Sequence, residues 1–391
     1  MTGTLQSNSP IRIGFVLTEL IGGGAERSML SIIDAIDQRR FAPTLILFTD
    51  RRDHEPPAGV PIIVLSGSAP FSVLRLVSRV RELARVVKRE RIDLLVSFLI
   101  GPNVVAIGAA KLAGVPVVIG ERSAPQTVLS DANPHLRFRG LWSRLVRLIY
   151  PRASYIVTNT AGARAELAAF LNVPPAKATV IPNPLDLDRV AALAAEPLDA
   201  GIAWPPDPVL VHVGRFTHAK DHDTLLTAFA RIRSRRAAAL VLVGDGEDEA
   251  QVRARCAELG LGSDVIFTGF TRNPYRYLAR ATISVLTSRF EGLPNVLIES
   301  MALGVPIVST ACQFGPVEIL GDNEYGILTP VGDADAFARA VEALLDDPDR
   351  RRELSRRGRA RAADFDRRRV GPAYEDLFAR ASLKSSRSTS T

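Results

Sequence analysis

The sequence predicts an α/β protein of two domains, each built on a doubly wound parallel sheet. The chain has 391 residues, which is too long for one ordinary hydrophobic core. Short apolar runs of strand length alternate with helical patterns along nearly the whole chain. A proline-rich stretch between Pro182 and Pro208 divides this alternation into two series. We therefore expect domains at residues 1–185 and 205–369, joined by a linker.

Composition and charge limit the classes of function. The apolar fraction of 47% and the charged fraction of 23% are typical of globular proteins, and no apolar run approaches the roughly 18 residues that span a bilayer. Two cysteines are too few for a disulfide framework or a metal cluster, so we expect a cytoplasmic protein. The net charge of +7 is uneven: residues 1–185 hold 22 Lys and Arg against 13 Asp and Glu. This half should face an anionic partner.

The first domain opens with a strand, a glycine loop and a helix. Ile11–Thr18 is apolar, Gly22–Gly24 follows, and a helical pattern continues to Ile36. Gly23 and Gly24 would let the backbone approach a ligand closely, although the loop can also serve only as a tight turn. The loop lacks the G-x-G-x-x-G spacing, which disfavours a dehydrogenase. The further strands expected here are Thr44–Phe48, Ile62–Leu65, Leu94–Leu99, Val115–Ile119 and Tyr155–Thr158.

A basic amphipathic segment, Leu136–Arg152, lies late in the first domain. Its apolar side chains, Trp142 among them, alternate with five arginines and no acid. Such a segment can lie on an anionic membrane surface, but it can also be a core helix with a solvated basic face. The expected helix Phe71–Arg91 adds seven cations. Nucleic acid would also suit this charge, yet no aromatic-interleaved patch or nucleic-acid motif is present, so we expect no nucleic-acid partner.

Four expected strands of the second domain each lead into a glycine or polar turn. The strands are Val209–Val213, Leu240–Val243, Val265–Thr268 and Ile283–Leu286. In a parallel sheet their carboxyl ends meet at one edge, so the turns should converge on one crevice. Arg215 and Lys220 lie five apart in the first turn, where a forked donor and a point charge can grip one diphosphate. Gly214, Gly246 and Arg272 also lie in these turns.

The stretch Ser288–Thr310 reads as a loop, a helix and a strand. Pro294 suits the first helical position, the helix is expected over Val296–Leu303, and Gly304 ends it. Backbone N–H groups at the start of such a helix have no internal acceptor, so they form a natural anion site.

Two carboxylates flank this helix start. Glu291 precedes the helix, and Glu299 lies about five residues into it, roughly 7 Å along the axis, on the face of Asn295. A carboxylate in such an apolar stretch costs free energy unless something pairs with it, although Glu299 can also be an ordinary helical residue that reaches solvent. A ligand with an anionic centre between hydroxyl groups would satisfy the helix start and both carboxylates. A sugar nucleotide has that layout.

Three motifs of the second domain occur together: Gly-Arg-x4-Lys-Asp at 214–221, Gly-Asp-Gly at 244–246, and Glu-x7-Glu from Glu291 to Glu299. This combination resembles the family 4 glycosyltransferases, and the resemblance covers nearly the whole chain. It implies the GT-B fold, in which two Rossmann-like doubly wound parallel-sheet domains face across a cleft. The resemblance is closest to the branch that builds bacterial surface polysaccharides and lipid-linked oligosaccharides.

The resemblance implies a role for each candidate residue. Arg215 and Lys220 would bind the donor diphosphate and neutralise the leaving nucleotide. Glu291 would contact the donor sugar, and Glu299 would hold the ribose hydroxyls. The other donor-binding positions would be the amides of Asn295 and Val296 at the phosphates, Arg272 near the base, the turns at Gly214 and Gly246, and Gly23 and Gly24 from the other domain.

It also implies a retaining hexosyltransferase that moves a sugar from a nucleotide sugar, with UDP as the expected carrier, to a glycan or polyprenyl-linked acceptor. No cofactor and no metal are expected, because cations and helix N–H groups can stabilise the leaving phosphate. The Asp-x-Asp pairs, such as Asp186 with Asp188, can instead cap helices. The protein would be peripheral at the inner face of the cell membrane. Residues 370–384 would pack back on the first domain, and Ser385–Thr391 is expected to be disordered.

One position departs from the family pattern. Many relatives carry a histidine after a strand of the first domain, near the sugar, whereas Glu121 and Arg122 occupy the corresponding place here. The role of these two residues stays open. Two other functions also stay open: a protein of this fold that binds a sugar nucleotide without transferring the sugar, and a phosphorylase on the same scaffold.

Overall fold

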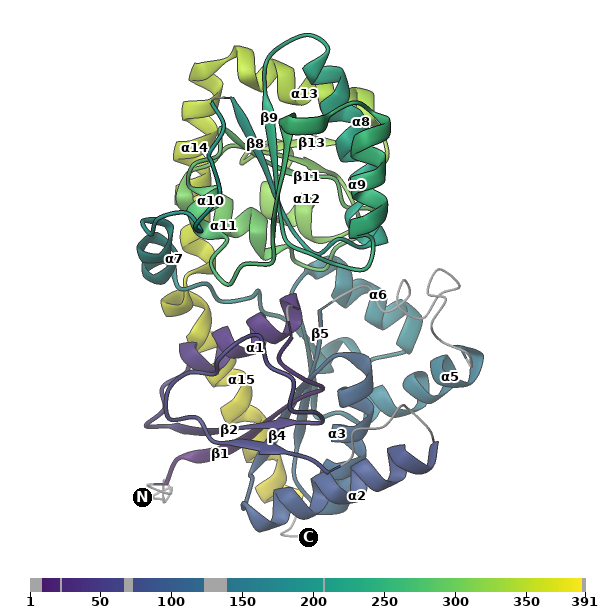
Figure 1. Ribbon diagram of the computed structural model, residues 1–391. Coiled ribbons are helices and arrows are strands. Elements are labelled where there is room, and N and C mark those ends of the chain that lie inside the picture. Colours follow the sequence, from purple (N-terminus) through teal and green to yellow (C-terminus); the bar gives the residue numbers. More distant parts are fainter. Residues whose placement is uncertain (1–8, 22, 67–72, 123–138, 207, 389–391) are drawn as a thin grey trace. The chain divides into compact units, whose positions relative to one another are not determined.

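The computed structural model describes residues 9–388, apart from residues 22, 67–72, 123–138 and 207. The chain divides into two units (Figure 1). The first contains the chain up to Pro184 and again from Arg367 onward, and the second contains Leu185–Asp366. The stretch 186–204, predicted as a linker, therefore belongs to the second unit.

Within its described residues the first unit holds a seven-stranded parallel sheet in the order β3-β2-β1-β4-β5-β6-β7. Apolar residues dominate these strands because helices cover both faces of a parallel sheet. The strands are β1 (Ile11–Leu17), β2 (Phe41–Leu47), β3 (Ile62–Val64), β4 (Leu94–Phe98), β5 (Val117–Glu121), β6 (Tyr155–Thr158) and β7 (Ala178–Val180). The helices are α1 (Gly24–Ala35), α2 (Val73–Arg89), α3 (Ile100–Ala113), α5 (Arg139–Ile149), α6 (Ala161–Leu171) and α15 (Arg367–Ser388), with 3-10 turns at Tyr150–Arg152 and Pro175–Lys177.

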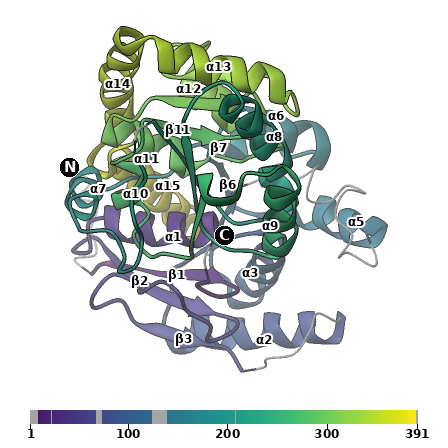
Figure 2. The ribbon, with the colours of Figure 1, turned by 45° about the horizontal axis from the view of Figure 1, so that its top comes forward.

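Two hydrophobic layers enclose this sheet. One layer joins the strands to α2, α3 and α5 through residues such as Leu83, Val104 and Val146. The other joins them to α1 and α15 through residues such as Ile32 and Phe378. Figure 2 shows α1 on one side of the sheet and α2 and α3 on the other.

The last helix, α15, completes the core of the first unit. Phe378 packs edge-on against Phe15 of β1, with ring centroids 6.0 Å apart, and the helix also contacts α1. It begins three residues before the predicted segment 370–384 and continues beyond it. The expectation of disorder from Ser385 is wrong as far as Ser388, which is helical. The last three residues lie outside the described range.

The second unit, over its described residues, holds a six-stranded parallel sheet in the order β10-β9-β8-β11-β12-β13. The strands are β8 (Val209–Val213), β9 (Ala239–Val243), β10 (Val265–Gly269), β11 (Ile283–Leu286), β12 (Ile307–Thr310) and β13 (Ile327–Thr329). The helices are α7 (Leu187–Ala194), α8 (His222–Arg233), α9 (Glu249–Glu258), α10 (Tyr275–Leu278), α11 (Asn295–Leu303), α12 (Gly315–Leu320), α13 (Ala334–Asp346) and α14 (Pro348–Ala362), with 3-10 turns at His218–Lys220, Gly262–Asp264 and Ala363–Phe365.

Both sheets have the same winding. The strand order reverses between β1 and β4 in the first unit and between β8 and β11 in the second, where Val211 pairs with Ser284. In the second unit α8, α9 and α13 pack on one face of the sheet, and α11 and α12 pack on the other (Figure 1). In sheets of this topology, ligands bind outside the carboxyl ends of the strands at the reversal.

The predicted linker is an ordered part of the second unit. Helix α7 packs on α10 through Val190, Ala194 and Tyr275. Further along, Trp204 lies beside Tyr277, with ring centroids 6.4 Å apart. The prolines between Pro182 and Pro208 predicted a linker, but Val190 and Ala194 are buried and Leu198, Ile202 and Trp204 are partly buried against the second unit.

Aspartates of the Asp-x-Asp pairs cap helices, as predicted. Asp186, Asp221 and Asp333 each accept a hydrogen bond from the backbone N–H three residues later, at 3.0, 3.5 and 2.8 Å. These carboxylates satisfy donors at the starts of α7, α8 and α13. In the ranges that the structure describes, no three His, Cys, Asp or Glu side chains are grouped to hold a metal ion.

Candidate functional site

A partly buried ion pair joins two turns at the strand reversal of the second sheet. Lys220 lies in the turn after β8 and Glu291 in the turn after β11, and Lys220 Nζ is 2.5 Å from Glu291 Oε1. The two side chains are 18% and 13% exposed. Ser288 Oγ donates to the same carboxylate oxygen at 2.7 Å. A cation and a carboxylate therefore lie side by side at the edge where this topology holds ligands.

Hydrogen bonds tie these two turns together. Thr287 Oγ1 donates to the carbonyl oxygens of Lys220 and Asp221, at 3.0 and 3.1 Å. The Arg289 N–H donates to the Ala219 carbonyl at 2.8 Å, and the Arg289 guanidinium pairs with buried Asp221 at 2.8 Å. The backbone on either side of Lys220 is thus held before any ligand arrives, which reduces the ordering that binding requires.

Gly244 and Gly246 allow the turns after β8 and β9 to approach each other closely. Their φ angles are +137° and +156°, and a Cβ atom would lie 2.1 Å from the Gly214 carbonyl oxygen or 2.3 Å from that of Phe216. A larger residue at either position would push the turn after β8 away from its place. This packing brings together the two turns that contain Gly214 and Gly246, both of which were predicted to bind the donor.

Helix α11 starts at the same edge of the sheet. Pro294 was expected at the first helical position but is the N-cap, and Asn295 begins the helix. Gly304 ends the helix in the left-handed conformation, as predicted. Asn295 and Val296 are only half-buried. Because the first N–H groups of a helix have no intrahelical acceptor, this helix start suits an anion.

Glu299 lies on the buried face of α11. It is 1% exposed, so the alternative in which it reaches solvent is wrong. The hydroxyl of Tyr275, on α10, donates to Glu299 Oε1 at 3.3 Å. Sequence reasoning missed Tyr275 because its helix has four residues and carries no motif. Glu299 is therefore a carboxylate oriented by the fold.

Arg215 and Arg272 are exposed. Among the described residues, no ion pair or hydrogen bond connects either of them with Lys220 or Glu291. The structure therefore does not bring Arg215 and Lys220 into contact, and their joint grip on one diphosphate stays a prediction.

The glycine loop of the first unit leads into α1. Gly23 is the N-cap of that helix and Gly24 its first residue, whereas Gly22 lies outside the described residues. A Cβ atom on Gly23 would lie 1.9 Å from Glu26 Oε2, while one on Gly24 would meet nothing within 4 Å. Gly23 thus makes room for the Glu26 side chain, and the ligand contact predicted for the loop stays a prediction.

Two buried histidines next to Lys220 were not singled out from the sequence. The rings of His212 and His222 meet edge-on, with centroids 4.9 Å apart. Burial, followed by the charges of His222 and Lys220, lowers the pKa of His212 well below its usual value. Burial, followed by the charge of Lys220, lowers the pKa of His222 to about 4. Both rings are neutral at pH 7, so Lys220 has no charged histidine beside it.

Glu121 and Arg122, whose roles the sequence left open, are buried at the end of β5. Their exposed fractions are 1% and 8%. Glu121 Oε1 accepts hydrogen bonds from the Tyr150 hydroxyl and, at 3.1 Å, from the Asn103 amide. Arg122 donates to the hydroxyl of Tyr374 on α15 at 3.1 Å. These contacts lie within the first unit, so the two side chains hold β5, α3 and α15 together.

The Glu121 carboxyl should make the stability of the first unit depend on pH. Burial raises its pKa to about 7 from 4.5, against the opposing hydrogen bonds of Tyr150 and Asn103. The charge of Arg122 also lowers the pKa, and that of Glu166 raises it. Because the folded-state pKa is the higher one, this group stabilises the fold fully below about pH 4.5. The contribution, about 3 kcal/mol, is lost as the pH rises through 7.

Glu121→Gln should therefore remove this decline in stability between about pH 4.5 and 7. The glutamine oxygen can still accept from Tyr150, so the hydrogen-bonded network is kept. The chain has two tryptophans, Trp142 in the first unit and Trp204 in the second. In a Trp204→Phe background, the fluorescence of Trp142 during urea unfolding would therefore report on the first unit alone. Parallel declines with and without Glu121→Gln would contradict the assignment.

Family models match both units of the chain. Residues 22–189 match the model described as Glycosyltransferase Family 4. Residues 200–361 match the model described as Glycosyl transferases group 1. The motifs that carried the resemblance at 214–299 all lie within the second match.

Two curated relatives are similar along almost their whole length. One is the N-acetylgalactosamine-N,N'-diacetylbacillosaminyl-diphospho-undecaprenol 4-alpha-N-acetylgalactosaminyltransferase of Campylobacter jejuni, 29% identical over 366 residues, or 92% of this chain and 97% of that protein. The other is the lipopolysaccharide core biosynthesis glycosyltransferase LpsE of Rhizobium meliloti, 31% identical over 366 residues, or 91% of this chain and 96% of that protein.

Two solved structures share the fold. HepE of Anabaena, in complex with UDP and glucose, superposes with a TM-score of 0.77 at 21% identity, covering 94% of this chain and 99% of that one. WaaG, a glycosyltransferase involved in lipopolysaccharide biosynthesis, superposes with a TM-score of 0.73 at 16% identity, with the same coverage. The predicted fold class, GT-B with two Rossmann-like parallel-sheet units, is confirmed.

Proposed function

The chain belongs to glycosyltransferase family 4, and we propose that it is a retaining enzyme that moves a sugar from a UDP-sugar to a glycan or polyprenyl-linked acceptor. The observation that carries this proposal is the Lys220–Glu291 pair next to the start of α11, at the strand reversal of the second sheet. The C. jejuni relative is named for an undecaprenol-diphosphate-linked glycan and the R. meliloti relative for the lipopolysaccharide core. Both names support an acceptor of this class.

Glycosyl transfer needs stabilisation of charge on the leaving diphosphate. The sugar passes through an oxocarbenium-like state while negative charge builds on the phosphate. The Lys220 amine and the N–H groups of α11 are in place before the donor binds, which makes them effective for such charge. Arg215 is exposed and can swing to the same phosphate as a bidentate donor. Glu291 would release the amine to the phosphate and accept from the hydroxyls of the sugar.

We infer a substitution on one face of the sugar. The bond between the anomeric carbon and the phosphate oxygen breaks while the acceptor oxygen bonds to the same face. The proton of the acceptor hydroxyl passes to the departing phosphate oxygen. Glu299, oriented by Tyr275, would hold the ribose hydroxyls. This scheme needs no metal ion, since Lys220, Arg215 and the helix start supply the positive charge.

Donor turnover tests this function. Purified protein incubated with UDP-, GDP- and ADP-sugars should release UDP, at the same rate with and without EDTA. Proton NMR of the product should show the anomeric configuration of the donor. A rate lost in EDTA and restored by Mg²⁺ would contradict metal independence. Turnover only with added phosphate would identify a phosphorylase, and binding of the donor without turnover would identify a binding protein.

We also propose that the first unit contacts an anionic membrane surface. This unit contains 28 Lys and Arg against 15 Asp and Glu. On α5, Val146 is buried whereas Leu148 is 60% exposed beside exposed Arg144 and Arg147. The helix therefore has both a core face and an outward face with apolar and basic residues, and residues 136–138 of the predicted segment lie outside the described range. In the part of the chain that is described, no helix has the length and apolarity to span a bilayer.

Co-sedimentation with vesicles tests the membrane contact. The protein should sediment with anionic vesicles, leave them at high salt, and ignore neutral ones, because each cation near an anionic leaflet contributes about 1 kcal/mol and salt screens it. A variant in which glutamine replaces Arg137, Arg139, Arg144 and Arg147 should no longer bind the vesicles but should still hydrolyse the donor. In a matched control, glutamine replaces four arginines of the second unit, and vesicle binding should not change. These are Arg253, Arg255, Arg280 and Arg339. If the first variant sediments like the wild type, α5 is only a core helix.

A further inference from the structure

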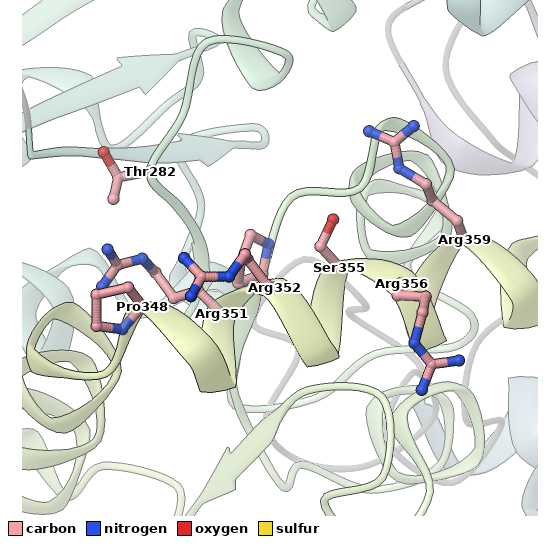
Figure 3. A pocket seen from close by; sticks show the side chains of 8 residues that line it. Thr282, Pro348, Arg351, Arg352, Ser355, Arg356 and Arg359 are labelled. Atoms are coloured by element: carbon pink, nitrogen blue, oxygen red, sulfur yellow. The ribbon is translucent and has the colours of Figure 1, made fainter.

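A groove of about 530 Å³ lies on the second unit, away from the candidate site. Four arginines of α14 line it, spread along the helix (Figure 3): Arg351, Arg352, Arg356 and Arg359. Thr282 and Pro306 also line it, and they immediately precede β11 and β12. The groove is therefore at the amino edge of the sheet, whereas the Lys220–Glu291 pair is at the carboxyl edge. A strand of four residues separates the two edges by roughly 13 Å.

Two of these arginines are held by the ends of other helices. Arg351 Nη1 donates to the carbonyls of Leu344 and Leu345, at 2.7 and 2.5 Å, in the last turn of α13. Arg359 Nη2 donates to the carbonyl of Leu303, at 2.9 Å, at the end of α11. A guanidinium has five N–H donors. These bonds therefore fix the two side chains and leave further donors for a ligand.

The other two arginines can adapt to a ligand. Arg352 pairs with Asp349, but the side chains are 71% and 88% exposed, and such exposed pairs contribute little to stability. Arg356 is exposed. The nearby Glu353 already pairs with Arg357 at 2.7 Å. An anion in the groove could therefore recruit both Arg352 and Arg356 at little cost.

The groove carries a local excess of positive charge. The described residues that line it contribute four guanidinium groups and no carboxylate. Each helix C terminus contributes roughly half a negative charge, and Asp349 contributes one, so roughly two positive charges remain. The second unit as a whole has 21 Lys and Arg against 27 Asp and Glu. The excess is thus a property of this groove and not of the unit.

We propose that this groove binds a soluble ligand with several phosphate groups. From Arg351 to Arg359 the helix rises roughly 12 Å, which exceeds the reach of a single phosphate. Guanidinium groups recognise phosphate oxygens in bidentate geometry, and the volume suits a small molecule. Among the described residues that line the groove there is no aromatic or long aliphatic side chain, so they offer neither a stacking surface for a base nor an anchor for a bilayer. These features favour a free polyphosphate over a nucleotide base or a lipid headgroup.

Calorimetric titration of the full-length protein with sodium tripolyphosphate tests this site. The groove should account for one binding event that Arg352→Gln combined with Arg356→Gln weakens by roughly tenfold or more. Arg215→Ala combined with Lys220→Ala should leave this event unchanged and affect only binding at the other edge of the sheet. The two pairs of variants therefore distinguish a failure of the groove proposal from a failure of the proposed function. A matched control, Arg253→Gln with Arg255→Gln on α9, should leave tripolyphosphate binding unchanged.

Two results would overturn the proposal. The first is unaltered tripolyphosphate binding in the Arg352 and Arg356 variant, or equal weakening in the α9 control, since either would show general attraction and no defined site. The second comes from sedimentation with vesicles that carry phosphatidic acid. The groove variant should sediment like the wild type, and a selective loss of vesicle binding would make the groove a lipid contact.

Discussion

Lys220→Ala is expected to lower kcat/KM by roughly 10- to 150-fold, which corresponds to about 1.5–3 kcal/mol of transition-state stabilisation. The amine lies 2.5 Å from Glu291 Oε1 at the edge where the donor diphosphate would bind. The loss should fall on kcat as well as on KM, because the phosphate charge that Lys220 would neutralise grows in the transition state. Arg215→Ala should give a loss in the same range.

The two variants differ in what else they disturb. Lys220→Ala removes the cation that pairs with Glu291, whose side chain is 13% exposed. The thermal unfolding of this variant must therefore be measured together with its kcat/KM. Arg215 is exposed, so Arg215→Ala should keep the wild-type Tm while the rate falls. Arg253→Ala on α9 is the matched control and should change neither. If kcat/KM stays near normal in both Lys220→Ala and Arg215→Ala, the leaving phosphate binds elsewhere.

Glu299→Gln is expected to weaken binding of the free nucleotide by roughly tenfold or more, because one charge-assisted hydrogen bond to a ribose hydroxyl contributes about 1.5–3 kcal/mol. The amide keeps the size of the side chain and can still accept from the Tyr275 hydroxyl. Tm should therefore stay close to that of the wild type. Calorimetric titration with UDP gives the Kd, and an unchanged Kd would remove the ribose assignment.

Tyr275→Phe separates positioning from direct contact. It deletes the hydroxyl 3.3 Å from Glu299 Oε1, so it should weaken UDP binding less than Glu299→Gln does. If Tyr275 acts only by orienting Glu299, the double variant should bind UDP no more weakly than Glu299→Gln alone. Additive losses would instead mean that Tyr275 meets the nucleotide itself.

Local sequence patterns were sufficient for most strands and for α11. The predicted bounds of β6, β8 and β11 agree with the structure. A strand covered on both faces is a continuous apolar run, which single-sequence patterns reveal. The edge strands β7 and β13 were not predicted as strands, whereas the equally short β3 was. The three residues of β3 are all β-branched and apolar, but β7 and β13 each include a threonine and a residue that is not β-branched.

Composition was a weaker guide where packing decides. The prolines between Pro182 and Pro208 predicted a linker, yet α7 and Trp204 are packed on the second unit. The serines near residue 385 predicted disorder, yet α15 continues to Ser388. In both places a local preference for irregular structure was outweighed by the helix and its contacts, which composition does not encode.

The sequence by itself determined that Lys220 and Glu291 follow strands and that Glu299 lies in the next helix, since each follows or flanks a recognisable apolar run. Only the tertiary structure decided which of them meet. Lys220 pairs with Glu291, 71 residues later, because β8 and β11 are neighbours in the sheet although β9 and β10 lie between them in the sequence. The order of strands in a sheet depends on the packing free energy of the whole unit, so no local spacing reveals it. For the same reason no local pattern in the arginine-rich residues 350–369 indicates a groove, which exists only because α14 lies across the amino ends of β11 and β12.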